Sequence, residues 1–213
     1  MEKKKMKLWQ KIVLGVLAVI IAVLIIWIMV NNSALNKIVA KQKEAVNGQN
    51  YSYTVQSNSS ENVTTKVYYK DGTKIYVTKN GDKSAIMWVN YNTNEMITII
   101  PSMLKATVQK YDGYDTTSVP YLLDESMSKV LKLSSIITSD TVNGEKCYKV
   151  SSLGLKLWFS KSTGMIVKAI NGKVVINEKE LDAISEFKDW KFNELTDVDI
   201  TRPNLIGYEV TNN

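Results

Sequence analysis

Few of the side chains that usually carry enzyme chemistry occur in this sequence. The chain has no histidine and a single cysteine, Cys147, so the familiar pairs of a nucleophile and a neighbouring base cannot be assembled. The tightest cluster of charged groups is Asp197, Asp199 and Arg202. Capping of one helical turn explains this cluster more simply than acid–base catalysis does. We therefore expect a protein that is not an enzyme.

Metal and cofactor sites are equally poorly supported by the sequence. No spacing of histidines or cysteines suits a metal ion, and no glycine-rich loop suits a phosphate. The segment YDGYD at residues 111–115 is similar to a calcium loop in part, but it lacks the further acidic ligands and the glutamate of a full loop. A solvated loop is the simpler interpretation. We expect no metal and no cofactor.

Apolar residues are the more informative candidates. In a predicted strand at residues 84–91, Met87, Val89 and Tyr91 share one face. Because Ile86 and Trp88 make the other face apolar too, the strand is either covered on both sides or lines a cavity with one side. Methionines suit adaptable pockets, although an ordinary core between sheet and helix is the alternative for each residue. The candidates for lining a hydrophobic ligand cavity are Met87, Val89, Tyr91, Ile97, Ile99, Met103, Leu104, Met127 and Trp158.

The elements that must position these residues are mostly strands. After residue 50, runs of β-branched and aromatic residues alternate with polar ones, and hairpin turns separate the runs. The turns are predicted at residues 92–94, at residues 161–164 and at the pairs Asp71-Gly72, Asn80-Gly81, Asn143-Gly144 and Asn171-Gly172. Residues 184–194 are expected to form the last long strand, and residues 178–183 are ambiguous.

Helices are expected at only a few places. Apolar stripes with helical spacing predict helices at residues 33–47 and 120–133. Residues 101–110 are a short helix or a loop, and residues 196–200 form one helical turn. No crossover helix separates the strands, which argues against a parallel α/β sheet. The sequence predicts one α+β domain, a strongly curved antiparallel sheet with helices against one face.

A membrane anchor is predicted at the N-terminus. Residues 12–30 carry no charge, and a helix of this length spans about 28 Å, close to the thickness of a bilayer core. A cleaved signal is the alternative, but its apolar core normally runs only about 7–15 residues. Five lysines and one glutamate precede the run, so the positive-inside rule predicts a cytoplasmic N-terminus. The expected organisation is a cytoplasmic basic leader at residues 1–11, a transmembrane helix at 12–30 and an extracytoplasmic domain at 31–213.

The net charge supports the same organisation. Of the formal charge of +6, the leader supplies +4. The exported part is therefore almost balanced and has no electrostatic footprint for nucleic acid.

Three segments of the chain resemble the LolA-like family of bacterial lipoprotein carriers and their Gram-positive relatives. Residues 34–57 resemble its opening helix and first strand, residues 144–170 its aromatic strands around a K-x-T-G turn, and residues 187–199 its closing strand and acidic turn. In that turn, Gly164 can take a positive φ and Thr163 can bond the local backbone. The resemblance implies an incomplete β-barrel whose concave face, covered by helices, holds acyl chains.

Two functions are open at this point. The first is a membrane-anchored extracytoplasmic domain that holds a lipid or an acyl chain in a hydrophobic half-barrel. The alternative is a cell-envelope scaffold or regulator that binds a protein partner through the same fold. The carriers of the family are soluble and many relatives are lipoproteins, whereas this chain keeps a protein anchor. The expected partners are the membrane, a lipid or acylated protein, and a cell-envelope protein.

Overall fold

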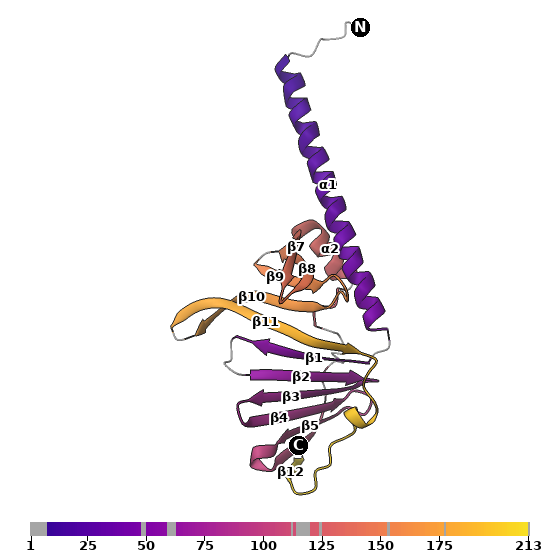
Figure 1. The fold of residues 1–213 in the computed structure, drawn as a ribbon, viewed down its shortest axis with the longest axis vertical. Helices are drawn as coiled ribbons and strands as arrows, with labels where there is room; N and C mark the ends of the chain where they lie inside the picture. The colour runs from indigo at the N-terminus through magenta and orange to yellow at the C-terminus, as the bar shows by residue number, and fades with distance from the viewer. Residues whose placement is uncertain are drawn as a thin grey trace.

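One long helix and one large sheet make up most of the protein (Figure 1). The structure, a computed structural model, describes residues 8–47, 50–58, 63–111, 113, 120–123, 125–152, 154–176 and 178–212. The helical elements are α1 (Leu8–Ala45), η1 (Pro101–Met103), α2 (Glu125–Ser134) and η2 (Val198–Ile200). The strands are β1 (Asn50–Ser57), β2 (Val63–Lys70), β3 (Thr73–Asn80), β4 (Lys83–Asn90), β5 (Glu95–Ile100), β6 (Lys105–Lys110), β7 (Ile136–Val142), β8 (Glu145–Ser152), β9 (Leu155–Ser160), β10 (Ile166–Ile176), β11 (Lys179–Phe192) and β12 (Glu209–Asn212).

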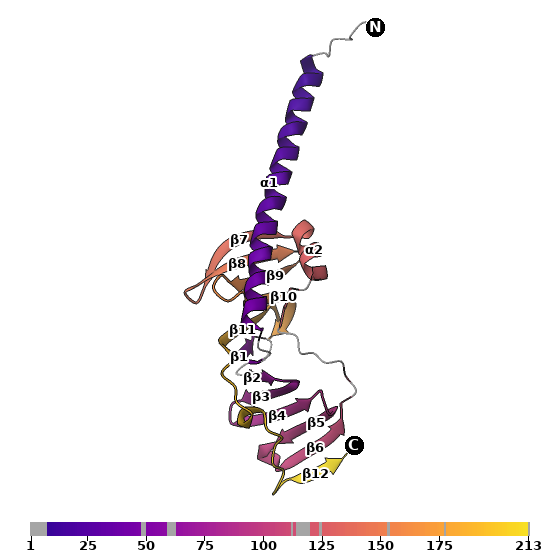
Figure 2. The ribbon, with the colours of Figure 1, turned by 90° about the vertical axis from the view of Figure 1, so that its right-hand side faces the viewer.

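Helix α1 joins the predicted span and the helix predicted at residues 33–47 without a break. It has 38 residues, and its apolar run projects away from the sheet with large exposed side chains (Figures 1 and 2). It is long and apolar enough to cross a membrane. Beyond the run, Leu35, Ile38 and Gln42 are almost completely buried. Their i, i+3, i+7 spacing places all three on the side of the helix that packs against the domain.

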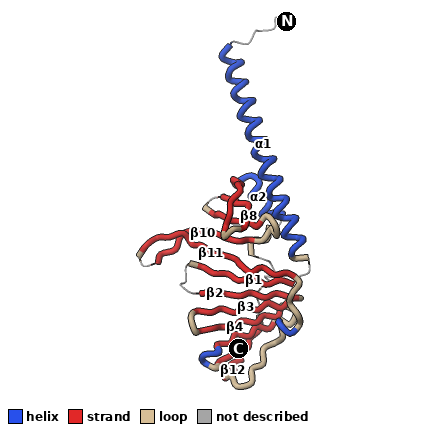
Figure 3. Tube along the Cα trace, in the orientation of Figure 1, coloured by secondary structure: helices blue, strands red, loops and turns tan. Residues whose placement is uncertain are grey.

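The sheet is open and contains twelve strands in the order β12-β6-β5-β4-β3-β2-β1-β11-β10-β9-β8-β7. Neighbouring strands are antiparallel except for one pair, because β12 runs parallel to β6. The predicted antiparallel sheet is thus confirmed, with a parallel strand added at its edge. Figure 3 shows how few helical segments accompany the strands.

The core lies where α1 and α2 meet one face of the sheet, which we call the helix-bearing face. Leu35 and Ile38 of α1 and Leu131 of α2 pack against apolar side chains of the strands. The strand residues in this core are Tyr51, Tyr53, Val67, Tyr69, Val150, Leu157, Phe159, Ile166, Ala169 and Phe187. On β11, a residue with positive φ, Asp189, interrupts the alternation. Trp190 therefore joins Phe187 against this core and stacks on Tyr53 with ring centroids 4.4 Å apart.

Turn chemistry explains most of the hairpins. Asp71 and Asn143 take positive φ and each precedes a glycine that does the same, as tight hairpin turns require. The Asn171-Gly172 pair is a correction: it lies inside β10, where the pairing with β11 shifts its register. A glycine that could have closed a turn instead forms a bulge in a longer strand.

Several ambiguous segments become strands. Residues 105–110 form β6 after the short η1 helix, and residues 179–192 form one strand, β11. The helix expected at residues 120–133 is α2, which begins at residue 125. The single turn expected at residues 196–200 is η2.

Candidate ligand-binding site

The two apolar faces of β4 are covered differently. Met87 and Val89 lie on the helix-bearing face, where Val89 is buried and Met87 is half-buried. Tyr91 follows on the same side and meets the Tyr111 ring edge-on, at 5.4 Å between centroids. Trp88 lies on the opposite face. Ile86 lies on that opposite face too, where it is half-buried and packs against the same cluster as Trp88.

Ile97 and Ile99 lie on the opposite face from Met87. They pack in a cluster with Trp88, and the C-terminal segment covers that cluster with apolar side chains of Ile200, Leu205 and Tyr208. The indole N–H of Trp88 donates a hydrogen bond to the Ile200 carbonyl at 3.0 Å. The two isoleucines are therefore core residues of that face, and the structure does not bring them together with Met87.

Loop length is the reason for this separation. A three-residue turn at residues 92–94 would place odd-numbered residues of both strands on one face. The actual loop has four residues, 91–94, and Asn90 pairs with Glu95. A shift of one residue exchanges the two faces of a strand, so Met87 lies opposite Thr98 and beside Met96 and Ile100. These last two were absent from the predicted lining, and only the loop length could have identified them.

Trp158 lies on the face opposite the helices as well. It packs with Cys147 and Val167 in a small cluster, and its indole N–H donates to Asp140 Oδ2 at 2.8 Å. The ammonium groups of two flanking lysines lie over the ring at 5.2 and 5.6 Å from its centroid. This tryptophan is 6% exposed and is enclosed by its neighbours.

The remaining candidates lie near two short helices. Met103 and Leu104 are each 60% exposed at the end of η1. Met127 belongs to α2, and its side chain lies outside the described residues.

A pocket forms on β3, β4 and β5, in the half of the sheet farthest from α2, and we call it the distal pocket. It has a volume of about 350 Å³, near the lower end of the range for small-molecule sites. Its apolar lining comes from Ala85 of β4, Ile100 of β5 and Met103 of η1, with Lys83 at the β3–β4 turn. The complete lining is Thr78, Asn80, Lys83, Ser84, Ala85, Ile100, Ser102 and Met103. Ala85 and Met87 are two residues apart on β4 and therefore share a face of the sheet. The pocket thus adjoins the half-buried side chain of Met87.

The space beneath the helices is filled by side chains. Leu35, Ile38, Phe159, Met165 and Ile166 are at most 1% exposed, as in a close-packed protein core. The part of the face in contact with α1 is therefore core, while a pocket of about 490 Å³ lies between α1 and α2. The open apolar surface lies farther along the sheet, at β3, β4 and β5.

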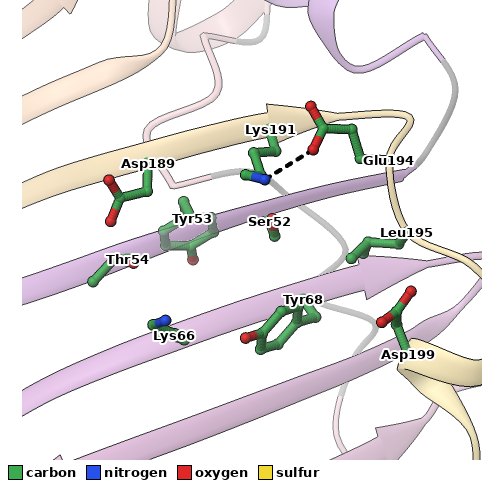
Figure 4. A pocket seen from close by; sticks show the side chains of 10 residues that line it. All are labelled: Ser52, Tyr53, Thr54, Lys66, Tyr68, Asp189, Lys191, Glu194, Leu195 and Asp199. Atoms are coloured by element: carbon green, nitrogen blue, oxygen red, sulfur yellow. Dashed lines mark ion pairs between the residues drawn. The ribbon is translucent and has the colours of Figure 1, made fainter.

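A second pocket, on the opposite face, is charged. It has a volume of about 460 Å³, and Figure 4 shows its side chains projecting from β1, β2 and β11 and from the chain after β11. Lys191 pairs with Glu194 at 3.0 Å, and this hydrogen bond raises the pKa of the lysine. Asp199 accepts hydrogen bonds of 2.7 Å from the backbone N–H and the hydroxyl of Thr196. These bonds lower the pKa of Asp199, so its carboxylate stays ionised as a cap.

The three charged residues of the predicted cluster have three different partners. Asp199 caps the turn at Thr196, Asp197 pairs with Lys70, and Arg202 pairs with Glu95 at 2.7 Å. The arrangement distributes their charges over separate structural contacts. Asp199 bonds the turn at Thr196, whereas Asp197, the N-cap of η2, makes no capping hydrogen bond with its side chain.

The two remaining candidates for chemistry are the thiol of Cys147 and a metal site. Burial raises the pKa of the Cys147 thiol to about 11, so the reactive thiolate is scarce at neutral pH. Among the described residues no group of three or more acidic, histidine or cysteine side chains is placed to hold a metal ion. The predicted loop at residues 111–115 lies mostly outside the described residues.

Comparisons with known proteins support the fold alone. No family model matches the chain, and no curated protein matches it. A solved structure, described as an uncharacterized conserved protein from Thermus thermophilus, is similar with a TM-score of 0.54 at 13% sequence identity. The match covers 84% of this chain and 98% of the other. At this identity the likeness extends to the architecture of the sheet and its helices.

Proposed function

We propose that this protein is a membrane-anchored, extracytoplasmic binding domain that takes an apolar chain, from a lipid or an acylated protein, into the distal pocket. The supporting observation is the open apolar surface on the helix-bearing face, to which methionine side chains contribute. Met87, Met96 and Ile100 are half-buried there, and Met103 is 60% exposed. Unbranched thioether side chains adapt to flexible chains of differing shape. No reaction is proposed.

The polar residues of the pocket suit an amphipathic ligand. Lys83 and Asn80 lie beside the apolar lining, so an anionic head group can pair with the ammonium group while its tail lies on Ile100 and Met103. Each methylene that leaves water contributes about 0.8 kcal/mol. A chain that covers several of these side chains gains most of its affinity from its tail.

The position of the pocket bears on how a ligand arrives. Strand β4 lies eight strands from β7 in the sheet order, and at about 4.8 Å per strand this is roughly 38 Å along the sheet. Because the end of the apolar run meets the domain beside β7, at Ser135, the pocket lies far from the span. That distance favours delivery of the apolar chain by a partner.

A protein partner is the second candidate for the same surface. The distance from the span favours it specifically, because an envelope protein can reach the distal pocket without leaving the aqueous layer. Apolar side chains of such a partner would occupy the space that an acyl chain fills in the first proposal.

A photoreactive fatty acid tests the proposal on the full chain in lipid nanodiscs. Peptide mapping should find adducts between residues 83 and 103, and Ala85→Asp together with Met103→Asp should abolish them. Val198→Asp is the matched control, because Val198 is 83% exposed on η2 and lines no part of the pocket. Adducts confined to α1, or adducts that survive the double substitution, contradict lipid binding at this site. Capture of a protein by a photoreactive residue at position 103 in cells supports the second candidate.

A further inference from the structure

Helix α1 is fixed to the domain immediately below its apolar run. Asn31, the first polar residue after that run, is 1% exposed. Its side-chain amide donates a hydrogen bond to the Ser135 carbonyl at 2.8 Å. Residues of α1 also contact α2 and β7. Because α1 is one uninterrupted helix, the domain and the span have a defined relative position.

This contact sets the level of the domain relative to a bilayer. Ser135 connects α2 to β7, and it meets α1 at the residue where the apolar run ends. Figures 1 and 2 both show α2 and β7 at the upper edge of the sheet, beside α1. When residues 12–30 lie in the hydrocarbon core, this edge of the domain lies at the head groups.

The edge carries the residues that such a position requires. Val130 is 61% exposed on α2, and Ile136 is 59% exposed at the start of β7. Lys129 and Lys132 lie on the same helix as Val130. Apolar side chains beside lysines are typical of protein surfaces that lie in the membrane interface.

We propose that Val130, Ile136, Lys129 and Lys132 form a membrane-contact edge that rests on the bilayer spanned by α1. Val130 and Ile136 enter the boundary between head groups and acyl chains, and the lysines lie at the level of anionic phosphates. The contact holds the sheet in one orientation, with β7 at the membrane and β4 distant from it. This inference rests on the anchoring role of α1 and is independent of what the distal pocket binds.

Fluorescent labels on single cysteines test the membrane-contact edge in the full chain. Val130→Cys and Ile136→Cys are each labelled with an environment-sensitive dye and reconstituted into vesicles of phosphatidylcholine and phosphatidylglycerol. Val23→Cys, within the apolar run, reports insertion of α1, and Ile206→Cys, 86% exposed and far along the chain, reports a water-exposed surface. The parent chain, treated with the same dye, is the background control and should take up little label, since Cys147 is buried.

Lipids that carry a quencher near the head group should quench the labels at positions 130 and 136 several-fold more than the label at 206. Lys129→Glu with Lys132→Glu should reduce the quenching at position 136 in vesicles that contain phosphatidylglycerol. Position 23 is read with a quencher on the acyl chain, at the depth of the apolar run. Quenching at 23 by that lipid, together with head-group quenching at 130 and 136 equal to that at 206, overturns the membrane-contact edge while leaving the anchor in place. Absence of acyl-chain quenching at position 23 overturns the anchor, and the proposal with it.

Discussion

Replacing Gly164 by alanine should have two destabilising effects, backbone strain at a positive φ and a steric clash with α1. Gly164 has φ +74°, and a Cβ there would lie 2.7 Å from the Ile38 carbonyl oxygen and 2.8 Å from the Gln42 nitrogen. The left-handed conformation costs an L-residue about 1–2 kcal/mol. The clash with α1 adds about 1–3 kcal/mol, as overpacking does in a core. We expect Gly164→Ala to lower the free energy of unfolding by roughly 2–5 kcal/mol.

Gly144→Ala is the matched control. Gly144 has φ +83°, and a Cβ there meets nothing within 4 Å. It should lose only the conformational part, about 1–2 kcal/mol, while the conformational entropy that the unfolded chain loses is the same for both substitutions. Urea denaturation of the full chain in nanodiscs, followed by tryptophan fluorescence, measures the difference. Equal losses for the two variants would refute the inference that the β9–β10 turn is pressed against α1.

Two further substitutions test the contacts around the helices and the opposite face. Gln42→Ala should lower the free energy of unfolding by about 1–3 kcal/mol. The reason is that the buried Gln42 amide accepts a hydrogen bond from the Leu123 N–H at 2.9 Å and donates one to the Tyr121 carbonyl at 3.2 Å. A denaturation midpoint equal to the parent's would contradict a stabilising role for these hydrogen bonds. The indole N–H of Trp158, more than any other group, lowers the pKa of Asp140. The ionised carboxylate therefore stabilises the fold at pH values above its ordinary pKa, and this contribution disappears as the pH falls through the lower folded-state pKa. Asp140→Asn should therefore flatten the acid limb of a stability–pH curve, and an unchanged limb would contradict the assignment.

Local chemistry was enough to predict most of the elements. The Asp-Gly and Asn-Gly pairs between alternating runs predict hairpins because only a few residues tolerate the positive φ of tight turns. The same turn residues close the β2–β3 and β7–β8 hairpins in the structure. Thr163 also accepts the Met165 N–H at 3.2 Å, as predicted for the K-x-T-G turn.

Nonlocal pairing accounts for the elements that were missed. Strand β12 is exposed along its whole length, so its sequence has no buried face to produce an alternating pattern. It exists because it pairs with β6, about a hundred residues earlier in the chain. Asn171-Gly172 fails as a turn for a related reason, since the pairing partner of β10 continues beyond it.

The structure brings together only some of the residues predicted for the candidate site. Met87 and Met103 lie on or beside the open apolar surface, whereas Ile97 and Ile99 belong to the opposite core. A change of one residue in the length of the loop at 91–94 would change which side chains of β5 share a face with those of β4. A sequence pattern shows that both strands are apolar on two sides, but it does not show how they are aligned.

Methionine methyl groups offer the most direct measurement of the proposed function. The full chain, with ¹³C-labelled methionine methyl groups, is placed in nanodiscs and titrated with a fatty acid while its methyl NMR spectrum is recorded. We predict that the signals of Met87, Met96 and Met103 shift together and saturate, while that of Met165, which is 0% exposed beneath α1, does not move. Signals of all three that stay unchanged, or a Met165 signal that moves as far as theirs, would contradict binding of an apolar chain in the distal pocket.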